Sequence, residues 1–249
     1  RRLSEKLPVA LHSKFLRLAL IPHLETNVLD AVYFYGAGCV PDKVPMMHNA
    51  LSTHLNTKNG IEVNTDMLAV ARGLCGHKPG IACIMGTGSN SCFYDGEKIA
   101  SNVSPLGFIL GDEGSGAVLG KLLVGDMLKN QMTPELKEKF LNKTGLTPPE
   151  IIDRVYRQPF PNRFLASLSP FLAENIQEPS VHALVLGSFK AFFQRNVMQY
   201  DYKNHPVHFI GSVAYHYQDI LHEAARELEI QITTIVKSPM QGLMTFHQS

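Results

Sequence analysis

The sequence contains no tryptophan, and its charges nearly cancel, with 23 lysines and arginines against 22 aspartates and glutamates and a formal net charge of +1. A chain without a basic excess has no electrostatic reason to bind nucleic acid or an anionic membrane surface. No apolar run approaches the roughly eighteen residues that indicate a membrane span, and no secretory signal is visible. We therefore expect a cytoplasmic protein with small-molecule ligands and neither a nucleic-acid nor a membrane partner.

Cysteine is scarce and has no metal-binding spacing. The four cysteines include no C-x-x-C pair, the eleven histidines form no H-x-x-x-H pair, and Cys83 lies inside an apolar run. These patterns argue against a zinc site and favour reduced, partly buried thiols. Glycine is absent before Gly36, and the chain starts at Arg1 instead of methionine. We expect from this that the natural chain begins upstream.

Two glycine-rich turns carry most of the functional information. Gly86-Thr87-Gly88-Ser89-Asn90 follows the apolar run 81–85, which is typical of a buried strand. The second turn spans 111–116 and leads into a helix-like segment from residue 117. Both turns expose backbone N–H groups, and the second adds the positive end of a helix dipole. Both are therefore predicted to suit oxyanions.

Strands and helices alternate along the chain, which predicts an α/β fold with a largely parallel sheet. The Asp95-Gly96 pair predicts a hairpin turn between 92–94 and 98–100. Thr133-Pro134 and the Thr147–Glu150 capping box each predict the start of a helix. The other strands are expected at 29–35, 61–63, 81–85, 207–210 and 230–236, and the helices at 14–24, 45–55, 67–75, 180–200 and 213–228.

Three of these strands end in small or acidic residues, at Thr65-Asp66, at Gly86 and at Gly211-Ser212. Ligands of open α/β sheets bind beyond the carboxyl ends of the strands. Each feature alone has a plainer interpretation: Asp66 as a helix N-cap, the first turn as an ordinary hairpin, and Asp112-Glu113 as charge matching at a helix start. Their order and spacing together favour a functional site.

These motifs resemble a known family. The segments Ile84–Asn90, Gly107–Ser115 and Gly211–Val213 are similar to the N-acetylglucosamine kinase branch of the BadF/BadG/BcrA/BcrD ATPases, within the superfamily of sugar kinases, Hsp70 chaperones and actin. The likeness covers roughly residues 30 to 249. It implies a two-lobed, ribonuclease H-like fold of the actin and hexokinase type, with ATP and Mg²⁺ as cofactors.

The resemblance also implies roles for individual residues. Asp66 matches the catalytic base, which also contacts the sugar hydroxyl. Thr87 and Gly88 match the second phosphate loop, which holds the β- and γ-phosphates of ATP. The positions that match contacts to the amino sugar are Ser89, Asn90, Gly107 and Asp112. The positions that match the adenosine-binding turn are Gly211, Ser212, Val213, Ala214 and Tyr215. No metal ligand is assigned.

We expect an N-terminal lobe at 1–78, completed by the C-terminal tail at about 237–249. The C-terminal lobe is expected at 79–236, with a helical insertion at about 117–200. The chain departs from the family at two places. Leu106 stands where these kinases often carry an aromatic residue, and nothing in 1–35 matches the Asp-x-Gly-x-Thr turn that supplies the first phosphate loop. The N-terminal lobe is therefore expected to be incomplete.

The leading hypothesis is a homodimeric kinase that transfers phosphate from ATP to N-acetylglucosamine or a related amino sugar. Two alternatives belong to other classes. One is an ATPase that activates a partner enzyme, like the iron–sulfur activators of the same family, although the four cysteines have no evident ligand arrangement. The other is a non-catalytic sugar- or nucleotide-binding module, which the unmatched first phosphate loop favours.

Overall fold

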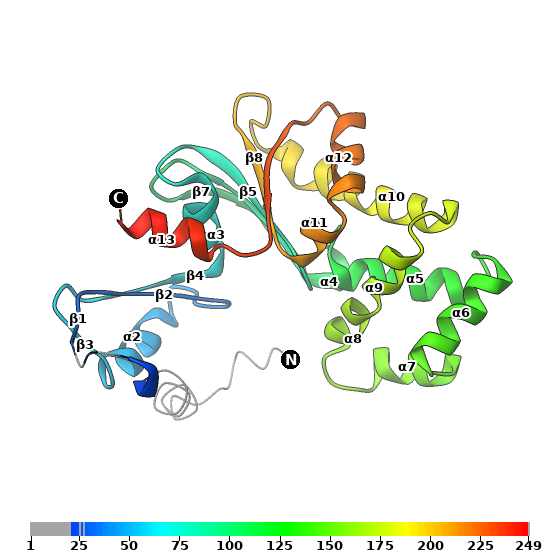
Figure 1. Ribbon diagram of the computed structural model, residues 1–249, viewed down its shortest axis with the longest axis horizontal. Helices are drawn as coiled ribbons and strands as arrows, with labels where there is room; N and C mark the ends of the chain where they lie inside the picture. Colours follow the sequence, from blue (N-terminus) through cyan, green and yellow to red (C-terminus); the bar gives the residue numbers. More distant parts are fainter. Residues whose placement is uncertain (1–20, 25, 27, 249) are drawn as a thin grey trace. The chain divides into compact units, whose positions relative to one another are not determined.

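A computed structural model of the chain describes residues 21–24, 26 and 28–248 (Figure 1). The described part divides into two compact units between Ala69 and Val70, within helix α3 (Asp66–Cys75). The predicted lobe ranges stay predictions. The predicted helix over 14–24 lies outside the described residues as far as residue 20, and Ile21–His23 form the short 3-10 helix η3.

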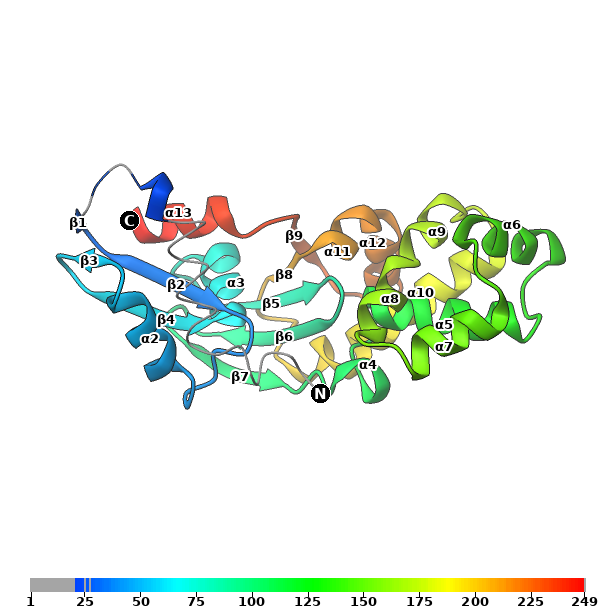
Figure 2. The same cartoon turned by 90° about the horizontal axis from the view of Figure 1, so that it is seen from below.

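The first unit contains parallel strand pairs around a small apolar core. Strand β1 (Val28–Leu29) pairs with β3 (Asn56–Thr57), and β2 (Val32–Gly36) lies beside β4 (Ile61–Thr65), as Figure 2 shows. Helix α2 (Val44–Ser52) packs on β4. The core of this unit contains Cys39, Met47, Leu51, Leu55 and Val63.

The strand predicted at 29–35 is interrupted at Asp30 and Ala31. The N–H groups of Lys58 and Asn59 donate to the carbonyls of Leu29 and Asp30, at 3.0 and 2.8 Å. The backbone of this segment is thus bonded to the 58–60 turn, so the chain changes partner between β1 and β2. The prediction of one continuous strand was wrong because this turn, distant in sequence, supplies the competing donors.

The second unit is built on a five-stranded sheet in the order β7-β6-β5-β8-β9. Its strands are β5 (Gly80–Met85), β6 (Ser89–Tyr94), β7 (Ile99–Val103), β8 (Val207–Ile210) and β9 (Ile232–Val236). Strands β5, β8 and β9 run parallel, whereas β6 runs antiparallel to its neighbours. Two hairpins followed by two parallel strands on the far side of β5 form the ribonuclease H-like arrangement, which confirms the predicted fold class.

The predicted Asp95-Gly96 turn is confirmed between β6 and β7. The Asp95 carboxylate accepts from the N–H groups of Glu97 and Lys98, at 2.9 and 2.8 Å, and Gly96 has φ +106°. These backbone donors lower the pKa of Asp95.

Helices occupy the chain between β7 and β8. In order, they are α4 (Gly107–Leu110), α5 (Gly116–Leu128), α6 (Pro134–Thr144), α7 (Pro148–Tyr156), α8 (Pro161–Ser167), α9 (Ser169–Glu174), α10 (Pro179–Arg195) and the 3-10 helix η4 (Val197–Gln199). The predicted cap of α6 is confirmed, because the Thr133 hydroxyl accepts from the N–H of Leu136 at 3.2 Å. The helix predicted at 180–200 ends instead at Arg195, before η4.

The single helix predicted at 213–228 is two helices, α11 (Ser212–His216) and α12 (Gln218–Glu227). Tyr217 interrupts them with φ −111° and ψ 23°. Tyr217 is only 5% exposed, its ring meets Phe189 edge-on, and its hydroxyl donates to the carbonyl of Ser169. The periodic pattern could not predict this break, because the pocket for Tyr217 is formed by α9 and α10.

The two faces of the sheet bury different elements. Residues Ile81, Cys83 and Met85 of β5 enter the main core with α10 and α12 on one side, and α3 with α13 (Met240–Gln248) lies on the other (Figure 1). Helix α13 crosses α3 where a Cβ on Gly242 would lie 1.9 Å from the carbonyl oxygen of Gly73. Only glycine permits so close a crossing at this position.

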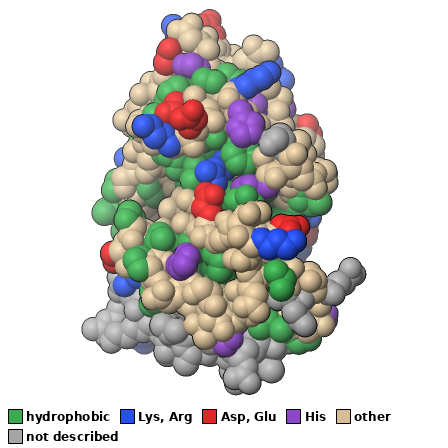
Figure 3. All heavy atoms as spheres, turned by 90° about the vertical axis from the view of Figure 1, so that its left-hand side faces the viewer, with side chains coloured by type: hydrophobic (Ala, Val, Ile, Leu, Met, Phe, Trp, Pro, Cys, Tyr) green, Lys and Arg blue, Asp and Glu red, His purple; other side chains and the backbone are tan. Residues whose placement is uncertain are grey.

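Charges of both signs are mixed on one face of the molecule. On the face shown in Figure 3, basic, acidic and histidine side chains are interspersed among hydrophobic ones. Within the described residues, no helix combines the length and apolar character needed to span a bilayer.

Candidate nucleotide and sugar site

The predicted phosphate turn and the predicted adenosine turn lie side by side in the second unit. They follow β5 and β8, which are parallel neighbours with Ile84 opposite Ile210. Gly211 has φ +119°, and a Cβ at this position would lie 2.4 Å from the carbonyl oxygen of Met85. Gly211 is therefore required both by its backbone conformation and by its contact with the end of β5.

The phosphate turn presents unpaired donors. The N–H of Gly86 closes the hairpin on the carbonyl of Gly88 at 2.9 Å, and Thr87 at its tip is exposed. Among the described residues, the N–H groups of Thr87 and Gly88 and the Thr87 hydroxyl have no hydrogen-bond partner. Unpaired donors on adjacent residues of a tight turn suit a phosphate group.

The start of α5 was predicted to be a second oxyanion site, and this prediction was wrong. The N–H groups of Gly116 and Ala117 donate to the carbonyls of Gly86 and Thr87, at 2.8 and 3.1 Å. The next donor, Val118 N–H, is capped by the Ser115 hydroxyl at 3.2 Å. These N–H groups are already used, so they cannot bind an oxyanion. They instead fix the phosphate turn in place through its carbonyls.

Asp112 lies beside the phosphate turn. A Cβ on Gly88 would be 3.1 Å from Oδ2 of Asp112, so the carboxylate occupies the space that a side chain at position 88 would need. Asp112 has φ +54°, and its N–H donates to the carbonyl of Pro105 at 2.9 Å. Asp112 thus has a left-handed backbone conformation, and its carboxylate lies against the hairpin at Gly88.

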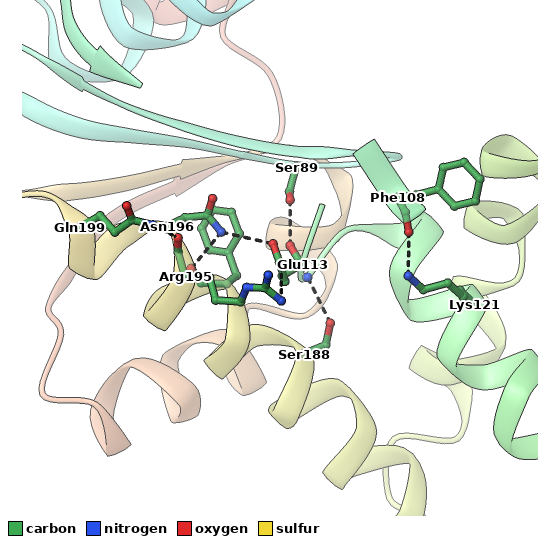
Figure 4. A network of polar contacts seen from close by, with 10 residues as sticks. Ser89, Phe108, Glu113, Lys121, Ser188, Arg195, Asn196 and Gln199 are labelled. Atoms are coloured by element: carbon green, nitrogen blue, oxygen red, sulfur yellow. Dashed lines mark hydrogen bonds and ion pairs between the residues drawn. The ribbon is translucent and has the colours of Figure 1, made fainter. Parts of the chain in front are cut away.

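The loop that carries Asp112 is anchored through its neighbours (Figure 4). The Glu113 carboxylate pairs with Arg195 at 2.9 Å, and the Glu113 carbonyl accepts from the Ser89 hydroxyl at 2.8 Å. The Ser188 hydroxyl accepts from the N–H of Gly114 at 3.1 Å. Sequence reasoning missed these anchors on α10, because no local signal relates Glu113 to residues so distant in sequence.

The sugar-contact residues predicted from the resemblance occupy different surroundings. Ser89 is 6% exposed, and its hydroxyl proton is used on Glu113. Asn90 is half-buried on the opposite face of β6. Gly107, with φ +77°, begins α4, which Lys121 holds through a 2.7 Å bond to the carbonyl of Phe108 (Figure 4). Their contacts with a sugar stay predictions.

Exposed apolar residues lie next to Gly107 in the sequence. Leu106, Ile109 and Leu110 are 60%, 73% and 69% exposed. Leu106 itself has φ +60° and precedes α4. Leu106, where the sequence was predicted to depart from the family, is therefore a solvent-facing apolar residue in this chain.

The predicted adenosine turn has an exposed side and a buried side. Ser212 and Tyr215 are exposed, whereas Val213 and Ala214 are 5% and 0% exposed and belong to the main core. Lys237 Nζ lies 6.0 Å from the centre of the Tyr215 ring. Val213 and Ala214 can therefore offer a nucleotide mainly their backbone.

Asp66 lies in the first unit, as the first residue of α3, and is exposed. The plainer interpretation made it the helix cap, but the Thr65 hydroxyl accepts from the N–H of Leu68 at 3.2 Å. Thr65 thus takes the capping role, although Asp66 Oδ1 also accepts from Met67 N–H at 2.9 Å. Asp66 also affects a thiol of the same unit, because burial together with the nearby Asp66 charge raises the pKa of Cys39.

The described cysteines carry free thiols, as expected. Burial raises the pKa of both Cys75 and Cys92 to about 12, so these thiols stay protonated at neutral pH. Within the described residues, no three histidine, cysteine or acidic side chains are grouped to hold a metal ion.

No protein-family model and no curated protein matches the chain. Among solved structures, the "Putative N-acetylglucosamine Kinase" of Porphyromonas gingivalis is 51% identical with a TM-score of 0.90, and the match covers 94% of this chain and 84% of that one. The "Putative N-acetylglucosamine Kinase" of Chromobacterium violaceum is 21% identical with a TM-score of 0.68, covering 87% and 75%. The second likeness concerns the fold alone.

The sheet order and these likenesses define the fold class of the protein, that of the actin- and hexokinase-like proteins. At 51% identity over 94% of its length, the chain belongs to the family of N-acetylglucosamine kinase-like proteins.

Proposed function

We propose that this protein is an ATP-dependent kinase of N-acetylglucosamine or a related amino sugar, in the BadF/BadG/BcrA/BcrD branch of its superfamily. The main support is the phosphate turn, where the unpaired donors of Thr87 and Gly88 lie beside the Asp112 carboxylate and next to the Gly211 turn. The printed name of the P. gingivalis relative supports the same activity.

Phosphoryl transfer depends mainly on positioning and on stabilising the charge that spreads over the transferred oxygens. The Thr87 hydroxyl and the N–H groups of Thr87 and Gly88 would supply fixed donors to the terminal phosphates. These donors are held by α5, whose first N–H groups bond the turn carbonyls. The turn is thereby preorganised, so little rearrangement is needed when charge develops.

Mg²⁺ would neutralise phosphate charge when bound, and it binds through phosphates, waters and one or two carboxylates. Asp112 is a carboxylate beside the turn and fits that requirement. In this proposal the same residue accepts hydrogen bonds from the sugar, because a carboxylate is a stronger acceptor than a neutral amide.

Asp66 is proposed as the general base that takes the proton of the attacking sugar hydroxyl. Its exposed carboxylate at the start of α3 supports this role, because Thr65 takes over the capping of Leu68. A positioned base contributes about 10²–10⁴-fold to the rate.

The decisive experiment replaces this base. Asp66→Asn should lower kcat at least about 100-fold, equivalent to about 3 kcal/mol of barrier, because the amide cannot accept the proton. ATP affinity, measured by calorimetry, should stay unchanged. Asp42→Asn is the matched control, an exposed aspartate of the same unit that should turn over normally. Normal turnover by Asp66→Asn would show that another group is the base.

A further inference from the structure

Lys237 follows the last strand of the sheet, at the end where the predicted phosphate and adenosine turns lie. Strand β9 ends at Val236, which is paired with Ile210 at the end of the parallel strand β8. The carbonyl of Val236 accepts from the N–H of Gly211 at 3.1 Å, and α11 lies beside the end of β9 (Figure 2). Because ligands of open α/β sheets bind beyond the carboxyl ends of the strands, Lys237 starts at the ligand side of the sheet.

The backbone on both sides of Lys237 is held by hydrogen bonds. The bond to the Val236 carbonyl precedes it. After it, the Ser238 hydroxyl accepts from the N–H of Met240, the first residue of α13, at 3.4 Å. The connection between β9 and α13 is thus short and tied at both ends. The backbone position of Lys237 therefore does not depend on its own side chain.

The side chain of Lys237 is directed at the predicted adenosine turn. Its Nζ lies over the Tyr215 ring, 6.0 Å from the ring centre, a distance at which the face of an aromatic ring attracts an ammonium. His216 meets the same ring edge-on, with the ring centres 5.4 Å apart. Both Lys237 and Tyr215 are exposed. The ammonium is therefore open to a ligand bound beside this turn.

The charge of Lys237 is not compensated by a carboxylate. In the part of the chain that the structure describes, Nζ of Lys237 has neither an ion pair nor a hydrogen bond. Lys190 of the same unit is instead paired with Glu227. An unpaired ammonium at the ligand side of a sheet favours an anionic group, and lysine binds phosphate as a point charge.

The order of the strands indicates which phosphate Lys237 can meet. Strand β8 separates β9 from β5, so the ends of β9 and β5 are two strand spacings, or roughly 10 Å, apart. The phosphate turn follows β5, whereas the adenosine turn follows β8, the direct neighbour of β9. Lys237 therefore lies nearer to the predicted nucleoside site than to the turn proposed for the β- and γ-phosphates.

We infer that Lys237 binds the α-phosphate of the nucleotide. The inference rests on the proposed function. The α-phosphate joins the nucleoside, predicted at the Gly211 turn, to the β- and γ-phosphates, proposed at Thr87 and Gly88. The flexible four-carbon stem of lysine lets the ammonium reach toward this group, while the Tyr215 ring keeps it beside the nucleoside end.

The test measures the binding of ATP, AMP and adenosine to Lys237→Met by calorimetry. The Kd of ATP and the Kd of AMP should both rise at least about fivefold, because each ligand carries the α-phosphate and loses a charged hydrogen bond. The Kd of adenosine, which has no phosphate, should stay unchanged, as should the KM for the sugar. Lys237→Arg keeps the charge and can stack on the Tyr215 ring, so its ATP affinity should stay within about twofold of the unmodified protein.

Lys203→Met is the matched control. Lys203 is an exposed lysine in the segment before β8, at the amino end of the strand, and its loss changes the net charge equally. This variant should bind all three ligands like the unmodified protein. Added sodium chloride should narrow the difference in ATP affinity between Lys237→Met and the unmodified protein, since salt screens an exposed charge.

An unchanged Kd of AMP in Lys237→Met overturns the inference, and so does an equal rise in the Kd of adenosine. Both results would leave the kinase function intact. Circular dichroism and thermal unfolding check that the variants are folded. If the unmodified protein neither binds ATP nor phosphorylates an amino sugar, the proposed function fails and the inference fails with it.

Discussion

At the scale of single residues, Asp112 combines an unusual backbone with a charged side chain beside the phosphate turn. Its φ of +54° is a conformation that asparagine and aspartate adopt more easily than other non-glycine residues. Asp112→Asn therefore removes the charge without straining the loop. We expect the KM for the sugar to rise about tenfold, or roughly 1.4 kcal/mol, because a charged acceptor becomes a neutral one.

Steady-state kinetics with the sugar and ATP varied in turn would check this prediction for Asp112. Asp219→Asn, an exposed aspartate on α12, is the control and should leave both KM values unchanged. If Asp112→Asn raised only the KM for ATP, the carboxylate would act on the nucleotide and its metal instead of the sugar.

At the scale of elements, the turn between β8 and α11 depends on a glycine. Gly211→Ala would place a Cβ only 2.4 Å from the carbonyl oxygen of Met85, and it would force alanine into a backbone conformation of φ +119°. We expect a loss of unfolding free energy of about 2–4 kcal/mol, since strain and overlap add. Urea denaturation measures this loss, and the variant should also bind ATP more weakly.

Gly187→Ala in α10 is the matched control for Gly211→Ala. Gly187 is exposed within a helix, and a Cβ there meets nothing within 4 Å. This change should stabilise the protein by about 0.5–1 kcal/mol, because alanine is the better helix former. Equal effects of the two substitutions would contradict the close approach of Gly211 to β5.

At the scale of the whole molecule, the residues predicted to bind ATP all belong to the second unit. An ATP analogue with Mg²⁺ and no sugar should slow hydrogen exchange at Thr87 and Gly88, whose N–H groups are unpaired among the described residues. Strands β1 and β3 of the first unit should exchange at unchanged rates. Amide exchange followed by mass spectrometry would check this pattern.

AMP is the control ligand for this exchange experiment, because it lacks the β- and γ-phosphates that the turn is proposed to hold. It should leave Thr87 and Gly88 exchanging rapidly. Protection of the first unit by the ATP analogue, with no change at the phosphate turn, would contradict the assignment. Light scattering would separately check the prediction of a homodimer.

The sequence by itself determined the features that depend on local chemistry. Asp95-Gly96 predicted its hairpin because the carboxylate bonds the two next amides, and Gly96 supplies a positive φ. The family motifs at Ile84–Asn90, Gly107–Ser115 and Gly211–Val213 predicted the fold class that the sheet order and the P. gingivalis relative confirm. The predicted role of each site residue stays to be tested.

Only the tertiary structure decided which groups distant in sequence contact or hydrogen-bond one another. The N–H groups at the start of α5 are taken by the Gly86 and Thr87 carbonyls, Glu113 is held by Arg195, and Tyr217 divides a helix to reach the core. None of these outcomes follows from periodicity or turn chemistry. The partner of a donor, an acceptor or a buried ring is not specified by the neighbouring sequence, because that partner comes within contact distance only when the chain folds.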